Sequence, residues 1–252
     1  MKMIKISLII MTLTLINGFM TDKPHFTIYT IGDSTMADKA PDVYPETGWC
    51  MVLKNYFDKS VTVRNHAVNG RSTKSFINEK RWKAVLDSLR PGDFVFIQFG
   101  HNDEKSNDTT RYTTPFGTYK ANLERFINET RAKGATPVLF TPIVRRKFGE
   151  NGTLEDTHGD YPAAVRDVAK NMNVLFVDLQ KLTEKWVNSL GDVASREYYL
   201  WTPPNDKFKE GRKDDTHLSE KGANQVARLA LRDCIRQNFP FSGRIYINIP
   251  AE

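Results

Sequence analysis

Cysteine is scarce in this sequence of 252 residues, which contains only Cys50 and Cys234. Two cysteines cannot build a disulfide-rich scaffold, and their surroundings lack the spacing of a metal site. Neither has a nearby histidine that would indicate a thiol nucleophile. In an exported protein the two can form a disulfide if the first and last helices share one face of a sheet; two free, buried thiols are the alternative.

Long hydrophobic runs are absent after the amino terminus, and no repeat, low-complexity tract or linker divides the chain. At the amino terminus a short basic stretch, residues 1–5, precedes an apolar run over 6–16 that is too short to span a bilayer comfortably. We interpret residues 1–20 as a secretory signal peptide, with a first core strand or helix as the alternative. Residues 21–252 are then predicted to form a single domain of an exported protein, secreted or periplasmic, with no stable membrane insertion.

A strong excess of one charge is also missing. Lysine and arginine total 36 against 30 aspartates and glutamates, which gives a formal net charge of +6 and a pI near 9.2. The basic residues are scattered and no nucleic-acid recognition motif occurs, so nucleic acid is not an expected partner. The modest excess is compatible with an acidic partner such as a uronic-acid polymer.

Apolar strand patterns alternate with amphipathic helix patterns along the chain. Strands are predicted near residues 28–31, 61–68, 93–99, 137–141 and 174–178, and helices over 48–57, 75–89, 119–133, 162–171, 182–190 and 219–237. This alternation, with nearly continuous apolar strands, predicts an α/β protein whose parallel sheet is covered by helices on both sides. In such proteins ligands bind at the carboxyl ends of the strands.

The first predicted strand ends abruptly in Gly32-Asp33-Ser34. A buried strand that stops at this tripeptide delivers a serine hydroxyl to the rim of the sheet, where it can act as a nucleophile. Glycine, aspartate and serine are also ordinary turn residues, so an inert turn is the alternative. Residues elsewhere in the chain must decide between the two.

A histidine and two aspartates lie far downstream, in the polar segment Asp214-Asp215-Thr216-His217 before the last predicted helix. A nucleophilic serine needs a base to accept its proton, and the base needs a carboxylate to orient it and to stabilise its charged form. His217 and Asp214, three residues apart on one loop, can supply both groups. Asp215 is the alternative carboxylate.

Two further strand ends carry groups able to stabilise a negative charge. Gly70 follows the second strand, and because it has no Cβ a substrate can come close to its backbone N–H. Asn102 follows the third strand and offers a side-chain amide. Acyl transfer passes through a tetrahedral oxyanion that such donors stabilise. The chain thus contains the components of an acyl-transfer site.

These segments resemble the conserved blocks of the SGNH (GDSL-type) hydrolase superfamily. The blocks occur in the family's order as Gly32-Asp33-Ser34-Thr35, Asn69-Gly70, Gly100-His101-Asn102-Asp103 and Asp214-Asp215-Thr216-His217. The resemblance implies a flavodoxin-like three-layer α/β/α sandwich with a five-stranded parallel sheet in the order 2-1-3-4-5. It implies no metal and no organic cofactor.

The same resemblance implies a role for each site residue. Ser34 is expected to be the nucleophile, His217 the general base and later acid, and Asp214 the carboxylate that orients His217. The oxyanion hole is expected to consist of the backbone N–H groups of Ser34 and Gly70 and the side-chain amide of Asn102.

Threonine follows the serine where the superfamily commonly has leucine, a variant that resembles the rhamnogalacturonan acetylesterase branch. The implied function is a serine esterase, a carboxylic ester hydrolase that removes O-acetyl groups from an acetylated pectic polysaccharide, here rhamnogalacturonan. Another esterase of the superfamily is the alternative, acting on acetylxylan, acetylated oligosaccharides or short acyl lipids. A binding protein that keeps only the fold is disfavoured, because Ser34 and His217 are both present.

Several residues are candidates for substrate binding. His101 either braces Asn102 or contacts the ligand. Arginine can hold a carboxylate with two hydrogen bonds, so the basic loop after the fourth strand can bind galacturonate; a solvated loop is the alternative. Trp201 can stack on a sugar, although packing beneath the loop competes with that role. The candidates are His101, Arg145, Arg146, His158 and Trp201.

Overall fold

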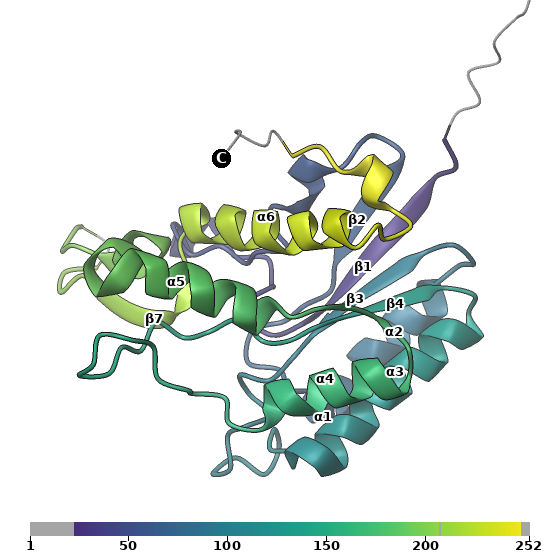
Figure 1. Cartoon of the computed structure of the whole chain (residues 1–252), viewed down its shortest axis with the longest axis horizontal. Coiled ribbons are helices and arrows are strands. Elements are labelled where there is room, and N and C mark those ends of the chain that lie inside the picture. Colours follow the sequence, from purple (N-terminus) through teal and green to yellow (C-terminus); the bar gives the residue numbers. More distant parts are fainter. Residues whose placement is uncertain (1–22, 207, 248–252) are drawn as a thin grey trace, which may run out of the picture.

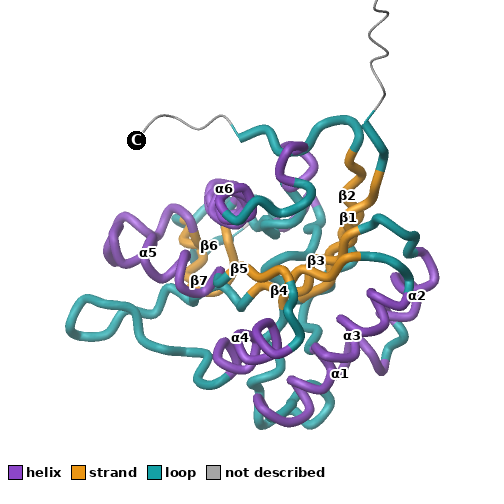
Figure 2. Tube along the Cα trace, turned by 45° about the vertical axis from the view of Figure 1, so that its right-hand side comes forward, coloured by secondary structure: helices purple, strands orange, loops and turns teal. Residues whose placement is uncertain are grey.

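The computed structural model describes residues 23–206 and 208–247, so the predicted signal peptide, residues 1–20, lies outside the described residues. Five parallel strands form one sheet in the order β2-β1-β3-β4-β5, as predicted. The strands are β1 (Phe26–Gly32), β2 (Val61–Asn65), β3 (Phe94–Gln98), β4 (Thr136–Phe140) and β5 (Leu175–Val177). Figures 1 and 2 show this twisted sheet between two layers of helices.

The two faces of the sheet are covered by different helices. On one face lie α5 (Leu179–Ser195) and α6 (Glu220–Arg236). On the other lie α1 (Thr73–Asn78), α2 (Arg81–Ser88), α3 (Lys120–Ala132) and α4 (Tyr161–Asn171). The predicted three-layer α/β/α architecture is therefore confirmed.

Both faces of the central strands are apolar, because each strand sends alternate side chains into a different core. In β3, Phe94 and Phe96 pack under α5 and α6, whereas Val95 and Ile97 pack under the other four helices. This double burial explains the nearly continuous apolar strand patterns in the sequence.

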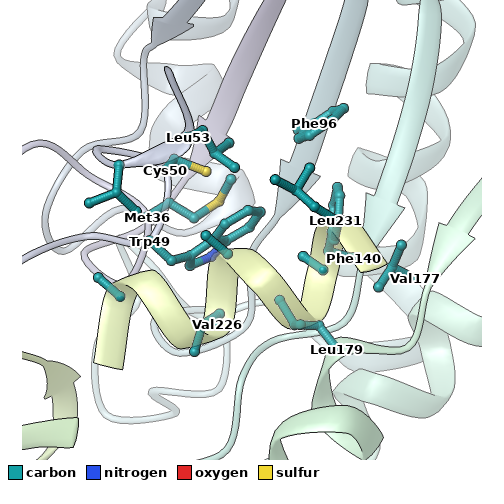
Figure 3. Close-up of a cluster of buried hydrophobic side chains, with 14 of the residues drawn as sticks. Met36, Trp49, Cys50, Leu53, Phe96, Phe140, Val177, Leu179, Val226 and Leu231 are labelled. Atoms are coloured by element: carbon teal, nitrogen blue, oxygen red, sulfur yellow. The ribbon is translucent and has the colours of Figure 1, made fainter. Parts of the chain in front are cut away.

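The core beneath α6 contains both cysteines. Figure 3 shows Cys50 among the buried apolar side chains of this cluster, with Trp49 and Leu231. Cys50 and Cys234 are free and buried, so of the two alternatives the disulfide is wrong and the free thiols are confirmed. Burial raises the pKa of both thiols, which therefore remain protonated and unreactive.

Two predicted helices are wrong in part. Residues 48–57 form successive tight turns and a short 3₁₀ helix, Leu53–Tyr56, instead of an α-helix. Tertiary contacts are the reason. The backbone N–H of Trp49 donates to the Thr35 carbonyl, and the chain at Gly48 packs so closely that a Cβ there would lie 2.1 Å from the backbone oxygen of Ala37. The predicted helix 75–89 is divided into α1 and α2 by Lys80, which adopts a left-handed conformation with φ 59°.

An antiparallel ribbon adjoins the sheet at the end of α5. It pairs β6 (Tyr199–Thr202) with β7 (Arg212–Leu218). Three short 3₁₀ helices and one π turn complete the described elements: Pro41–Val43, Arg196–Tyr198, Ser242–Arg244 and Pro115–Tyr119. Asp214 and His217, expected on a loop before the last helix, both lie on β7.

Candidate active site

Ser34 lies in a tight turn directly after β1. The Asp33 carboxylate accepts hydrogen bonds from the backbone N–H of Thr35 at 2.9 Å and from its hydroxyl at 2.8 Å. Buried Gln98, the last residue of β3, donates to the Thr35 hydroxyl at 2.7 Å and accepts from the Trp49 indole at 2.9 Å. This buried polar network fixes the turn, so the hydroxyl of Ser34 is held in a defined place at the edge of the sheet.

Gly32 is required where β1 meets the turn. A Cβ at this position would lie 2.2 Å from the Met36 sulfur and 2.4 Å from the Gln98 carbonyl oxygen. Any larger residue would therefore push the turn away from β3. The glycine that the motif contains allows Ser34 to project from the end of the strand.

The other two members of the predicted triad lie on β7 and reach Ser34. His217 Nε2 is 2.9 Å from the Ser34 hydroxyl oxygen, and His217 Nδ1 is 2.7 Å from Asp214 Oδ2. The second carboxylate oxygen of Asp214 accepts the backbone N–H of Thr216 at 2.8 Å and that of His217 at 3.0 Å. The structure thus joins carboxylate, imidazole and hydroxyl in one hydrogen-bonded series.

Asp214 is held in its charged form. Partial burial by itself would raise the pKa of this carboxyl, but the hydrogen bonds from the ring and backbone of His217 outweigh it and keep the pKa well below its usual range. Arg212 Nη2, 3.6 Å from the same carboxylate, adds a positive charge. An ionised Asp214 can stabilise the positive charge that His217 gains when it accepts a proton.

Three N–H donors lie beside Ser34. The backbone N–H groups of Ser34 and Gly70 donate no hydrogen bond within the described part of the chain. Asn102 uses one of its two side-chain N–H bonds on the Arg71 carbonyl, at 3.2 Å, which leaves the other available. Gly70 has φ +75°, a conformation that favours glycine.

Asn102 is positioned by its neighbours in the loop after β3. The buried Asp103 accepts hydrogen bonds from the backbone N–H and hydroxyl of Thr73 and from the hydroxyl of Thr113. Burial raises the pKa of Asp103 to about 7 despite these bonds. Arg111 Nη1 lies 3.3 Å from Asn102 Oδ1 and so orients the amide with its amino group directed away from the arginine.

A pocket of about 450 Å³ surrounds the triad. Its lining residues are Ser34, Glu46, Asn69, Gly70, His101, Asn102, Lys105, Arg111, Arg145, Thr216 and His217. The residues predicted to form the triad and the oxyanion hole therefore meet at one site, with only Asp214 behind the pocket surface. Among the described residues no cluster of histidine, cysteine, aspartate or glutamate is arranged to hold a metal ion.

Of the five candidates for substrate binding, His101 and Arg145 line this pocket. His101 is almost completely buried, with Nδ1 3.3 Å from Asp33 Oδ2, and burial lowers its pKa to about 4. The ring is therefore uncharged at neutral pH. Arg145 bonds to Glu104 and to the Thr157 carbonyl, so it reaches the pocket as part of an anchored loop.

The other three candidates lie outside the pocket and have internal partners. His158 bonds through Nδ1 to Glu104 and through Nε2 to the Ile143 carbonyl, both at 2.8 Å. Arg146 is buried and pairs with Asp215 at 2.7 Å and with Asp192. Its guanidinium lies 4.5 Å from the Trp201 ring centre, and the Arg196 guanidinium lies equally close to that ring. Trp201 therefore lies outside the pocket of Ser34 and makes cation–π contacts with both arginines.

Asp215, the alternative carboxylate for the triad, also has internal partners. It accepts hydrogen bonds from Arg146 and from the Trp201 indole, both at 2.7 Å. Asp214, not Asp215, therefore contacts His217.

Three charged residues of the pocket were missed by the sequence analysis: Glu46, Lys105 and Arg111. Lys105 and Arg111 lie in the long loop after β3, at the carboxyl edge of the sheet, and this position was the one available signal. Glu46 pairs with Lys39 at 2.9 Å and Arg212 at 3.2 Å, and these cations keep its pKa low against the effect of burial.

Comparison with known proteins agrees with this geometry. A model of the GDSL-like Lipase/Acylhydrolase family matches residues 30–224. The chain is 41% identical over 204 residues to rhamnogalacturonan acetylesterase RhgT of Bacillus subtilis, covering 80% of this chain and 86% of that protein. It is 35% identical over 218 residues to the probable rhamnogalacturonan acetylesterase YesY of the same organism, covering 86% and 96%.

A solved structure shares the fold. The crystal structure of the Bacillus subtilis protein YxiM matches with a TM-score of 0.72 and 28% identity, covering 86% of this chain but only 58% of YxiM. The family match extends from β1 into α6 and so includes every strand end that contributes to the site. The chain therefore belongs to the GDSL-like lipase/acylhydrolase family.

Proposed function

We propose that this protein is a rhamnogalacturonan acetylesterase that uses Ser34 as its nucleophile. The observation that carries the proposal is the hydrogen-bonded series from Asp214 through His217 to Ser34, open to a pocket with three N–H donors. The series supports ester hydrolysis. The similarity to RhgT and YesY supports the acetylated pectic substrate.

In the first half of the reaction the hydroxyl of Ser34 attacks the acetyl carbonyl carbon. His217 Nε2 accepts the hydroxyl proton, and Asp214 stabilises the imidazolium that results. The carbonyl oxygen becomes an oxyanion that accepts hydrogen bonds from the N–H groups of Ser34, Gly70 and Asn102. When the tetrahedral intermediate collapses, the sugar oxygen leaves with the proton of His217 and Ser34 holds the acetyl group.

In the second half a water molecule takes the place of the sugar hydroxyl. His217 accepts a proton from the water as it attacks the acetyl-serine, and the same three donors stabilise the second oxyanion. Collapse releases acetate and returns the proton to Ser34. Every step uses groups of this chain and water, so the proposed mechanism requires neither metal nor organic cofactor.

The charge of the pocket supports an acidic polysaccharide as the substrate. Lys105, Arg111 and Arg145 line it against one carboxylate, that of Glu46, which two other cations already neutralise. The name rhamnogalacturonan, carried by two relatives, describes a polymer that contains galacturonate. An anionic main chain would be attracted to this site.

We also propose that the protein is exported and acts on pectin outside the cytoplasm. The basic start and apolar run within residues 1–20 support a signal peptide. No helix of the described residues is long and apolar enough to cross a membrane. Cell fractionation and amino-terminal sequencing of the mature protein test this proposal: a mature chain beginning near residue 21 supports it, and an intact Met1 in the cytoplasm contradicts it.

Acetate release from a panel of acetylated polysaccharides tests the substrate. Acetylated rhamnogalacturonan, xylan and mannan are compared at equal acetyl content, with 4-nitrophenyl acetate and octanoate as small esters. The proposal requires the highest kcat/KM on rhamnogalacturonan and a clear preference for acetyl over octanoyl. Preference for xylan, or efficient octanoate hydrolysis, would assign the site to another esterase of the family.

A further inference from the structure

Two loops after the strands supply the positive charge in the active-site pocket. Lys105 and Arg111 come from the loop after β3, and Arg145 comes from the loop after β4. All three line the same pocket as Ser34 and His217. The charge is therefore next to the reacting groups and not on a distant surface.

Two of these cations already have a carboxylate partner. Arg111 Nε lies 2.5 Å from Asp108 Oδ2, and Arg145 pairs with Glu104. These ion pairs hold the arginines in place and offset their charge. Their remaining N–H groups still face the pocket or its walls, as the contact between Arg111 and Asn102 shows.

Lys105 differs from both arginines. Within the described part of the chain its ammonium forms no ion pair and donates no hydrogen bond. Partial burial lowers its pKa, as does repulsion from Arg111 and Arg145, against a weaker attraction from Glu104 and Asp108. A cation that is crowded by other cations and lacks a counter-ion is stabilised when an anion binds beside it.

A second hollow adjoins the active-site pocket. This hollow has a volume of about 560 Å³ and shares Gly70 and Arg111 with the active-site pocket. Arg71 and Lys74 also line it. Gly70 and Arg111 thus line both hollows, and Lys105 lines the one that contains Ser34.

We propose that Lys105, supported by Arg111, forms a subsite for the carboxylate of a uronic acid next to the acetylated sugar. The proposal rests on the proposed function and specifies how the acidic main chain is positioned. Lys105 contributes a single charged donor, and Arg111 contributes an N–H group already oriented by Asp108 and Asn102. The subsite is then a positioning element for the substrate and takes no part in proton transfer.

Lys105→Gln and Lys105→Glu test the subsite, with Lys133→Gln and Lys133→Glu as matched controls. Lys133 is exposed beyond the end of α3, just before β4 begins and so at the opposite edge of the sheet. On acetylated rhamnogalacturonan we expect Lys105→Gln to lower kcat/KM about 5- to 30-fold, mainly through KM, and Lys105→Glu to lower it further. On neutral 4-nitrophenyl acetate the two Lys133 variants should match the wild type, and Lys105→Gln should lose a much smaller factor than it does on the charged polymer.

A second substrate separates charge from shape. Acetylated rhamnogalacturonan whose carboxyl groups have been methyl-esterified should be a poorer substrate for the wild type by a similar factor. Lys105→Gln should show no further loss on it, because the interaction that the variant removes is already absent. Rising salt should narrow the difference between wild type and Lys105→Gln on the charged substrate. Equal losses on charged and esterified substrates would overturn the subsite.

A binding measurement keeps this test independent of the proposed reaction. Calorimetric titration with a deacetylated rhamnogalacturonan oligosaccharide should show weaker binding to Lys105→Gln than to the wild type or Lys133→Gln. If no acetate is released from rhamnogalacturonan but this binding difference is found, the proposed function fails and the subsite stands. If acetate is released and binding is unaffected by Lys105→Gln, the subsite fails and the proposed function stands.

Discussion

Asp214 and His217 are three residues apart on strand β7, yet their side chains meet at 2.7 Å. In a regular strand such residues point to opposite faces and lie roughly 10 Å apart. Here the register of the β6–β7 ribbon jumps: Leu200 pairs with Asp214, whereas the preceding residue, Tyr199, pairs with Leu218. Residues 215–217, which lie between Asp214 and Leu218, therefore form a bulge in β7. The Asp214 carboxylate stabilises this bulge by accepting hydrogen bonds from the backbone N–H groups of Thr216 and His217.

The neighbouring residues Asp214 and Asp215 have different partners, so the same substitution is predicted to have different effects at the two positions. Asp214→Asn should lower kcat about ten-thousand-fold, because an amide does not stabilise the imidazolium and allows the wrong tautomer. Asp215→Asn should retain activity within about three-fold and lower stability instead, because Asp215 contacts Arg146 and Trp201. Turnover of 4-nitrophenyl acetate and denaturant titration of both variants check this, and the reverse pattern would exchange their roles.

The amide of Asn102 is predicted to act only when negative charge develops. Asn102→Ala should lower kcat about 100- to 1000-fold with little change in KM, because the amide contacts the oxyanion and not the neutral ester. Steady-state kinetics with 4-nitrophenyl acetate measure both constants. A variant that raises KM and keeps kcat would place Asn102 in ground-state binding.

Arg146 is predicted to support the structure rather than to bind substrate. Arg146→Met should lower the free energy of unfolding by about 2 kcal/mol, because Asp192 and Asp215 lose the buried cation that both contact. The half-exposed side chains of Asp192 and Asp215 keep the loss at this level, since water can solvate them in part. KM for acetylated rhamnogalacturonan should change less than two-fold by this argument. A large rise in KM in a stable variant would return Arg146 to the substrate site.

His101 is predicted to make the fold sensitive to acid. Burial lowers its pKa from 6.5 to about 4, so the folded state resists a proton that the unfolded chain accepts. This contribution to stability is complete above about pH 6.5 and is lost as the pH falls through 4, a change of about 3 kcal/mol. The charged and titratable groups around the ring are Asp33, His158, Arg145 and Glu104.

Denaturant titrations of the wild type and His101→Gln between pH 7 and 4 measure this contribution. The variant should lose less stability over that interval, because glutamine does not take up a proton. Parallel curves for the two proteins would show that another group causes the acid sensitivity.

Much of the fold could be predicted from the sequence because the central strands have an unambiguous pattern. Buried on both faces, β3 reads as a continuous apolar run, and repeated alternation with helices leaves few topologies. Ser34, Gly70 and Asn102 could be selected because the ends of parallel strands meet at one edge of the sheet. They lie in the loops that follow β1, β2 and β3.

Elements that depend on tertiary contacts were harder to predict. β7 contains Arg212-Lys213-Asp214-Asp215-Thr216-His217, a polar run without the alternation of a half-buried strand, and its partner β6 has only four residues. The segment after Gly48 has a helical apolar pattern, but its backbone is bound to the turn of Ser34. In both places long-range hydrogen bonds override the local pattern.

The substrate loops show a different limit. Arg145 and Arg146 are adjacent and chemically identical, yet one lines the pocket and the other is buried against Asp215, which lies 69 residues later. Composition cannot tell which of two neighbouring arginines has a partner elsewhere in the fold. For the same reason the sequence does not distinguish Lys105 from other lysines. Only the structure shows that its ammonium has no partner among the described residues.

The most direct test of the proposed mechanism is to detect the acetyl group on Ser34. Wild-type protein mixed with acetylated rhamnogalacturonan and quenched in acid within milliseconds should carry one acetyl group by intact-mass spectrometry, located on Ser34 by peptide analysis. Ser34→Ala should carry none and should release acetate at least about ten-thousand-fold more slowly while remaining folded. Acetate release by Ser34→Ala at a rate near that of the wild type would contradict the mechanism.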